Sequence, residues 1–200
     1  LADAMQVVGS VQIRNRGTLV GNSCHASPAA DTVPGLLVHD AVVLAVGAAG
    51  VREIPIDDFI LGPRRTALQP GELAAAIRIP KPSAATGTAF ARMTRRRGVD
   101  LATINLHCSV DADGRVRFAF GAVGPRAFLA EDRSGILADP TSSEVARREA
   151  VEQVLQAASP ISDVRASDRY RWGMLRVLSL RALAQAHARL QGAAPATEER

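Results

Sequence analysis

Small and oxygen-bearing residues gather in one segment of this chain, RNRGTLVGNSCHASPAAD, residues 14–31. Gly17 and Gly21 permit the left-handed backbone in which successive N–H groups converge on an anion. Asp31 can accept hydrogen bonds from ribose-like or ribityl hydroxyls. Three further side chains add hydrogen-bond donors: Thr18, Asn22 and Ser27. The segment therefore favours contact with a phosphorylated ligand, and a plain polar loop explains the same residues about as well.

Other chemistry in this segment is less well supported by the spacing. His25, Ser27 and Asp31 have the residue types of a catalytic triad, but a working triad usually collects its members from separate elements. Cys24 and His25 could begin a metal site, yet no second pair follows at ligand spacing. The sequence thus predicts no catalytic residue and no metal ligand here.

Two other motifs contain residue types that could do chemistry. Asp57 and Asp58 form a paired carboxylate, but IPIDDFILGP favours a turn after a strand, with one of them capping the next element, over acid–base catalysis. GTLVGN has neither the spacing of a dinucleotide-binding fingerprint nor that of a P-loop.

Composition limits the class of protein. With 200 residues, 47% hydrophobic and 22% charged, the chain can bury one good core or two small ones. No stretch approaches the ~18 apolar residues that a membrane span needs. The opening LADAMQVVGS lacks the basic start of a leader, and two cysteines suit a reducing compartment. We expect a cytoplasmic protein without a membrane span.

The net charge of +4 comes almost wholly from arginine, because Lys81 is the only lysine. The triplet Arg95–Arg97 is the densest basic cluster and raises the question of nucleic acid. Aromatic residues make up only 4% of the chain, and acidic residues such as Asp100 follow the basic ones. We expect a solvated arginine-rich face and no nucleic acid partner.

The first half of the sequence predicts a helix tail over residues 1–9 that Gly9 ends, followed by the polar loop. Apolar runs occupy 36–38 and 42–46, and GAAG joins the second run to 51–56 as a hairpin. An alternating strand over 75–79 precedes PKP, whose two prolines indicate a subdomain boundary.

The second half predicts strands within 88–97 and 101–110, a DADG turn, and a strand over 115–120 with one packed and one wet face. Two helices follow. Thr141 and Glu144 form a capping box for the first, and Ser167 or Asp168 caps the second, which Gly192 ends. The expected fold class is α+β, an antiparallel sheet covered by helices on one face.

Several motifs in order carry a family resemblance. QIRNRGTLVGNSCHASPAADTVPGLL resembles the second FAD-binding subdomain of the flavoprotein (medium) subunit of molybdenum hydroxylases, the xanthine dehydrogenase and carbon monoxide dehydrogenase family. AFARMTRRRGVDLATINLHCSVDADGRV and AVGPRAFLAEDRSGIL resemble its C-terminal domain. The resemblance implies a partial PCMH-type α/β subdomain over 1–82, a carbon monoxide dehydrogenase flavoprotein C-terminal-like domain over 83–192, and a flexible tail over 193–200.

The resemblance also implies a function. Such subunits hold FAD noncovalently and relay electrons from iron–sulfur clusters to an external acceptor. The implied partners are a molybdenum-cofactor large subunit and an iron–sulfur small subunit, assembled as a dimer of heterotrimers. A cofactor-free assembly module that binds partner subunits stays open as the alternative.

The resemblance places the site residues by position. Ser27 is predicted as a ligand contact from its residue type alone. The resemblance implies flavin contacts at Val8, Thr18, Leu19, Val20, Gly21, Asn22, Asp31, Ala74 and Arg92. The family turn usually has two adjacent glycines, and Val20 replaces the first, so we expect a negative φ there or weakened binding. The family's other FAD-binding subdomain is not found before residue 1, so we expect poor FAD retention by this segment in isolation.

Overall fold

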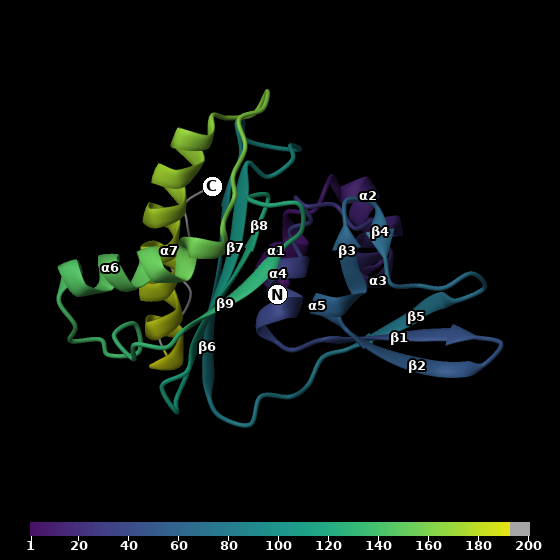
Figure 1. Ribbon diagram of the computed structural model, residues 1–200, viewed down its shortest axis with the longest axis horizontal. Coiled ribbons are helices and arrows are strands. Elements are labelled where there is room, and N and C mark those ends of the chain that lie inside the picture. Colours follow the sequence, from purple (N-terminus) through teal and green to yellow (C-terminus); the bar gives the residue numbers. More distant parts are fainter. Residues whose placement is uncertain (193–200) are drawn as a thin grey trace.

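The computed structural model describes residues 1–192 as an α+β fold with two hydrophobic cores (Figure 1). One core belongs to the helices and hairpin of the first half, and the other lies between a four-stranded sheet and the two C-terminal helices. The tail over 193–200, expected to be flexible, lies outside the described residues.

Half of the polar segment, 9 of its 18 residues, is helical, which corrects the expectation of one long loop. Residues 2–38 contain four short helices: α1 (Ala2–Gln6), α2 (Val11–Arg16), α3 (Leu19–Cys24) and α4 (Val33–Val38). Gly9 separates α1 from α2 with a φ of +53°, as the expected helix stop. The hydroxyl of Ser10 accepts from the Ile13 amide and that of Thr18 from the Gly21 amide, so each hydroxyl caps the helix that comes after it.

The prediction of a left-handed backbone that binds an anion is therefore wrong for this segment. Gly17 has an extended backbone with φ −74° and ψ 156°, and Gly21 lies inside α3. Val20 is also a helical residue of α3, so the valine in place of a glycine causes no backbone strain. The apolar run over 36–38 is helical as well, because Pro34 stands in the first turn of α4.

The predicted hairpin is confirmed. β1 (Val42–Gly47) pairs antiparallel with β2 (Gly50–Pro55) and, on its other side, with β5 (Leu73–Arg78). Between β2 and β5 lie three short elements: α5 (Ile56–Phe59), β3 (Ile60–Gly62) and β4 (Arg65–Thr66). Asp57 and Asp58 are in the first turn of α5 and not at its N-cap, Pro55, which corrects their expected capping role.

The C-terminal sheet runs in chain order with every pair antiparallel. Its strands are β6 (Thr86–Met93), β7 (Ile104–Asp111), β8 (Val116–Gly121) and β9 (Phe128–Asp132), the last of which was not predicted. The remaining elements are α6 (Glu144–Val154), the 3₁₀ helix η1 (Leu155–Ala157) and α7 (Asp168–Leu190). In Figure 1, α7 lies along one face of this sheet, and α6 crosses beside it.

The helix caps agree with the sequence at one helix and not at the other. Ser167 caps α7 as expected, through its hydroxyl and the Tyr170 amide. At α6 the cap is Ser143, which accepts from the Ala146 amide. Thr141 instead donates its hydroxyl proton to Asp139, so the predicted capping box is wrong.

The expected wet face of β8 is also wrong, because all six residues of the strand are buried. Phe118 and Phe120 belong to the second core, whereas Ala119 belongs to the first. Helix α4 packs on β8, so the first half of the chain covers that face. Arg117 is buried there and pairs with Asp40 at 2.7 Å.

No helix within residues 1–192 is both long enough and apolar enough to cross a membrane. In the same part of the chain, no three His, Cys, Asp or Glu side chains are grouped so that they could hold a metal ion.

Candidate functional site

A cleft of about 340 Å³ lies where the short N-terminal helices meet the end of β6 and the loop that follows it. Five of the predicted flavin contacts line it: Val8, Asn22, Ser27, Asp31 and Arg92. They come from the α1–α2 connection, from α3, from the segment before α4, and from β6. The fold thus brings together residues that are up to 84 positions apart in the sequence.

A second hollow of about 550 Å³ adjoins this cleft along α1 and α2. Gly9, Arg92 and Val99 line both spaces, so the two hollows are neighbours. Arg14 lines the second hollow and donates to the carbonyl oxygens of Val8 and Gly9, which ties α2 to the turn before it.

Asp31 is the acidic group of the cleft and is only 6% exposed. Its Oδ1 lies 3.1 Å from Nε of Arg92 and accepts a 2.9 Å hydrogen bond from Nδ2 of Asn105. No described residue bonds to Oδ2. Burial raises the pKa of the Asp31 carboxyl above its usual range, while the Asn105 hydrogen bond and the charge of Arg92 act in the opposite direction.

Arg92 is the basic group of the cleft, and its Nη2 donates to the carbonyl oxygen of Asp100. Its Nε–H is buried against Asp31, with which the guanidinium forms an ion pair at 3.1 Å. The side chain therefore joins Asp31 to the loop that connects β6 and β7.

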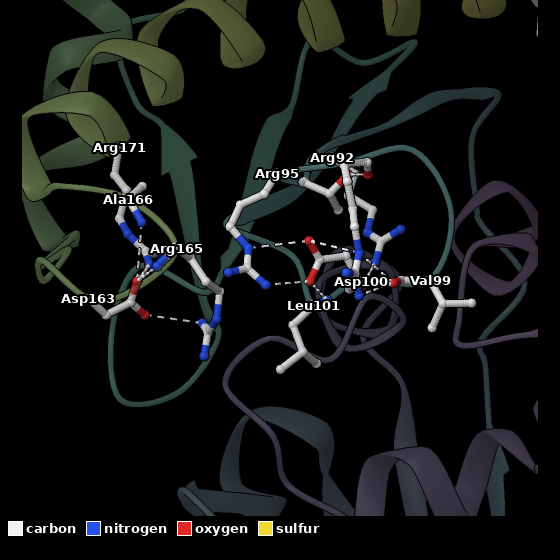
Figure 2. Close-up of polar contacts among 11 residues, drawn as sticks. Arg92, Arg95, Val99, Asp100, Leu101, Asp163, Arg165, Ala166 and Arg171 are labelled. Atoms are coloured by element: carbon white, nitrogen blue, oxygen red, sulfur yellow. Dashed lines mark hydrogen bonds and ion pairs between the residues drawn. The ribbon is translucent and has the colours of Figure 1, made fainter.

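That loop is held together by arginines around one carboxylate. Figure 2 shows Arg95 directed at Asp100, to which its Nη2 and Nε donate at 3.1 and 3.3 Å. Arg96 lies 3.9 Å from the same carboxylate and donates to the Val99 carbonyl. The hydrogen bond from Arg95 lowers the pKa of Asp100. Two arginines of the basic triplet are thus paired within the loop.

The other predicted contacts do not line the cleft. Thr18, Leu19, Val20 and Gly21 lie in or cap the first turn of α3, where the Thr18 hydroxyl accepts from the Gly21 amide at 2.9 Å. Leu19 and Ala74 pack against the first hydrophobic core, with α3 against β5. Only Asn22 of α3 reaches the cleft lining, with its Oδ1 accepting from the Thr32 hydroxyl at 2.7 Å.

Sequence reasoning assigned no ligand contact to four polar residues in or beside the cleft: His25, Arg96, Asp100 and Asn105. Asn105 is fully buried on β7 and is the hydrogen-bond partner of Asp31. A lone amide within the strand sequence TINLHCSV was the available signal, since a buried polar side chain needs a partner. The sequence indicates Asp100 only as a charge that offsets the arginines before it.

Comparison with known proteins identifies the chain. Residues 1–82 match the FAD binding domain in molybdopterin dehydrogenase, and residues 88–186 match the CO dehydrogenase flavoprotein C-terminal domain. The chain is 30% identical to the carbon monoxide dehydrogenase medium chain of Hydrogenophaga pseudoflava, over 94% of this chain and 67% of that protein. This chain belongs to the FAD-binding medium subunits of molybdenum hydroxylases.

Other members of the family are named for different substrates. The chain is 32% identical to 6-hydroxypseudooxynicotine dehydrogenase complex subunit alpha of Paenarthrobacter nicotinovorans, over 93% of this chain and 64% of that protein. It is 28% identical to the xanthine dehydrogenase FAD-binding subunit of Escherichia coli O157:H7, over 96% of this chain and 68% of that subunit. The chain therefore spans about two thirds of the length of these family members.

The fold agrees with this membership. A solved carbon monoxide dehydrogenase from Hydrogenophaga pseudoflava superposes with a TM-score of 0.84 at 30% identity, covering 94% of this chain and 67% of that one. The expected α+β medium-subunit fold is thereby confirmed.

The cleft chemistry fits part of an FAD molecule. Oδ2 of Asp31 is an acceptor without a partner among the described residues, because Arg92 and Asn105 both contact Oδ1. The hydroxyl groups of FAD are donors that can bond to this oxygen. Val8, Val99 and Leu101 supply apolar surface in the same lining.

Proposed function

We propose that this chain forms part of the electron-transfer flavoprotein subunit of a molybdenum hydroxylase and binds FAD in the cleft around Asp31 and Arg92. The observation that carries the proposal is convergence. Contacts assigned by family position, taken from four separate segments, line one cleft beside Oδ2 of Asp31, an acceptor without a partner among the described residues. A solvated polar loop does not predict such convergence.

When bound, FAD takes up electrons from one-electron carriers and passes them on singly or in pairs. Oδ2 of Asp31 would accept a hydrogen bond from a hydroxyl of the ligand, because Oδ1 is already used by its two partners. The guanidinium of Arg92, whose charge is partly offset by Asp31, would favour a negatively charged reduced flavin over the neutral oxidised one. Val8, Val99 and Leu101 would give the bound ligand apolar surface to pack against.

For the remaining predicted contacts, the family resemblance is the only support. Thr18, Leu19, Val20, Gly21 and Ala74 do not line the cleft, so geometry adds no support for them. We assign them to flavin contact only because they occupy the family's positions.

We also propose the wider setting. The partners are a molybdenum-cofactor large subunit, which oxidises the substrate, and an iron–sulfur small subunit, which delivers electrons to the flavin, in a dimer of heterotrimers. Relatives named as a medium chain or as a complex subunit support a multisubunit assembly. The two unpaired cysteines support a reducing compartment, the cytoplasm. Separate cores support a division into units 1–82 and 83–192.

The test is flavin occupancy of the full-length protein, purified as it assembles in cells. Asp31→Ala is expected to lower the visible flavin absorbance per protein, because the change removes the free acceptor of the cleft. Asp57→Ala is the matched control, since Asp57 is also paired with an arginine, Arg126, but lies outside the cleft. Far-ultraviolet circular dichroism verifies that both variants are folded.

Two outcomes contradict the proposal. An intact assembly without flavin would favour the cofactor-free module. Equal flavin content in Asp31→Ala and the wild type would move the site away from this cleft.

A further inference from the structure

Asn105 is an amide buried on β7, the strand next to β6, and the residue is 0% exposed. Its Nδ2 donates to Oδ1 of Asp31 at 2.9 Å and to the carbonyl oxygen of Ala29 at 3.3 Å. One amide group thus grips the segment before α4 at two points. Rotating the amide by half a turn would set its oxygen against a carboxylate and a carbonyl, so these partners fix its orientation.

Sheet register explains why the grip is rigid. Arg92 on β6 is paired with Asn105 on β7, and Asn105 is paired with Gly121 on β8. The two side chains that contact Oδ1 of Asp31 therefore stand side by side in one row of the sheet. Because neighbouring strands hold this row in place, the carboxylate is positioned by the sheet and not by its own loop.

Gly121 leaves the space that the amide occupies. A Cβ added there would lie 2.0 Å from Oδ1 of Asn105, closer than any tolerated contact. Just beyond it, the Ala122 amide donates to the Pro28 carbonyl at 2.7 Å, so the same end of β8 also holds residues that precede Asp31. Asn105 and Gly121 act as a pair, in which the glycine admits the amide and the amide holds the carboxylate.

We propose that Asn105, admitted by Gly121, is the positioning residue that holds Asp31 and leaves its Oδ2 free for the flavin; this inference rests on the proposed FAD site. Asn105 does not line the cleft and so acts only through Asp31. One of its two hydrogen bonds occupies Oδ1 of Asp31, and the other holds the Ala29 carbonyl of the same segment. Together they fix the carboxylate, which lowers the entropy lost when a ligand binds to the remaining oxygen.

The experiment measures the dissociation constant of FAD for the full-length protein, purified as it assembles in cells, stripped of flavin and titrated with FAD. Asn105→Leu removes the donors at similar volume, and Gly121→Ala displaces the amide without changing a polar group. Both are expected to raise the dissociation constant about tenfold or more, as for the loss of a hydrogen bond to a charged group. Both are also expected to alter the visible circular dichroism of bound flavin, which reports a fixed ligand environment.

The matched control is Gly87→Ala. A Cβ at Gly87 would also meet an atom at 2.0 Å, the Ala186 carbonyl oxygen, but on the α7 face of the sheet and away from Asp31. We expect this variant to lose thermal stability while the flavin affinity and visible dichroism of the folded protein stay at wild-type values. Should Asn105→Leu fail to fold, Asn105→Ser, which is too short to reach Asp31, takes its place.

The outcomes separate the two ideas. Wild-type affinity in Asn105→Leu and Gly121→Ala overturns the positioning role and leaves the FAD site standing. Equal loss of affinity in Gly87→Ala and Gly121→Ala reduces Asn105 to a stabilising residue and also overturns the role. A wild-type protein that binds no FAD overturns the proposed function itself, together with this inference.

Discussion

Replacing Arg171 by methionine is expected to destabilise the fold more than any surface change. Arg171 is 1% exposed and donates to the carbonyl oxygens of Thr103 at 2.6 Å and Ala122 at 2.8 Å, and to Asp163 at 2.7 Å. These bonds fasten α7 to the start of β7, to the end of β8 and to the loop before α7, shown beside Arg165 in Figure 2. Methionine keeps the apolar packing and removes all three.

The magnitude depends on the groups that are left without a partner. Two carbonyl groups lose a charged donor, at about 1–3 kcal/mol each if they stay unsatisfied. Asp163 keeps the backbone amides of Arg165 and Ala166 as well as the guanidinium of Arg165, so its loss is small. We expect Arg171→Met to lower the free energy of unfolding by about 3 kcal/mol, near the lower end for a broken buried pair. For a chain of this size, that lowers Tm by about 6–12 °C.

The assay is urea denaturation of the full-length protein, followed by fluorescence of Trp172, the one tryptophan of this sequence, on α7. Arg165→Met is the control, because Arg165 pairs with the same carboxylate at 3.3 Å but remains 27% exposed. Its loss is expected to stay below about 1 kcal/mol. Similar small losses for both variants would refute the view that buried arginine bonds hold α7 on the sheet.

Two further predictions test local features. Ser143→Ala is expected to cost about 1 kcal/mol of unfolding free energy, the usual value of an N-cap. Thr141→Ala is expected to cost clearly less, because of these two residues only Ser143 bonds to an amide of α6. Equal losses in a denaturation experiment would support the predicted capping box of Thr141 and Glu144. Cys108 is fully buried, and burial holds the pKa of its thiol well above the usual range. We expect it to resist iodoacetamide at neutral pH until the protein unfolds, whereas the partly exposed Cys24 reacts earlier. Mass spectrometry that finds Cys108 modified first in the folded protein would contradict its burial.

The hairpin of the first half and the last helix could be predicted from the sequence because their patterns are local. The hairpin of β1 and β2 follows from two β-branched runs around GAAG, and α7 from an apolar stripe that begins at a serine cap. Helices α2 and α3 have only six residues each, fewer than two helical turns. An apolar helical periodicity cannot develop over that length. The local signal in the sequence is therefore limited to the capping residues, Ser10 and Thr18.

Burial of β8 could not be predicted, because it depends on a contact between distant parts of the chain. Arg115 and Arg117 give the strand an alternating pattern, which is typical of one wet face. In the fold, Arg117 is buried against the first half of the chain, and Asp40, 77 positions away, pairs with it. A charged residue is thus buried without any local sign of its partner.

The candidate site shows the same division between what is local and what is distant. Family position singled out Asp31 and Arg92, but not Asn105, which holds Asp31 from 74 positions away. Burial raises the pKa of Asp31, so keeping this carboxylate charged inside the protein costs free energy. Its two partners offset that cost and do not turn it into net stability, since apolar residues often replace buried ion pairs without loss. A buried carboxylate that adds no net stability, and that has one oxygen free beside a cleft, is better explained by ligand binding than by folding.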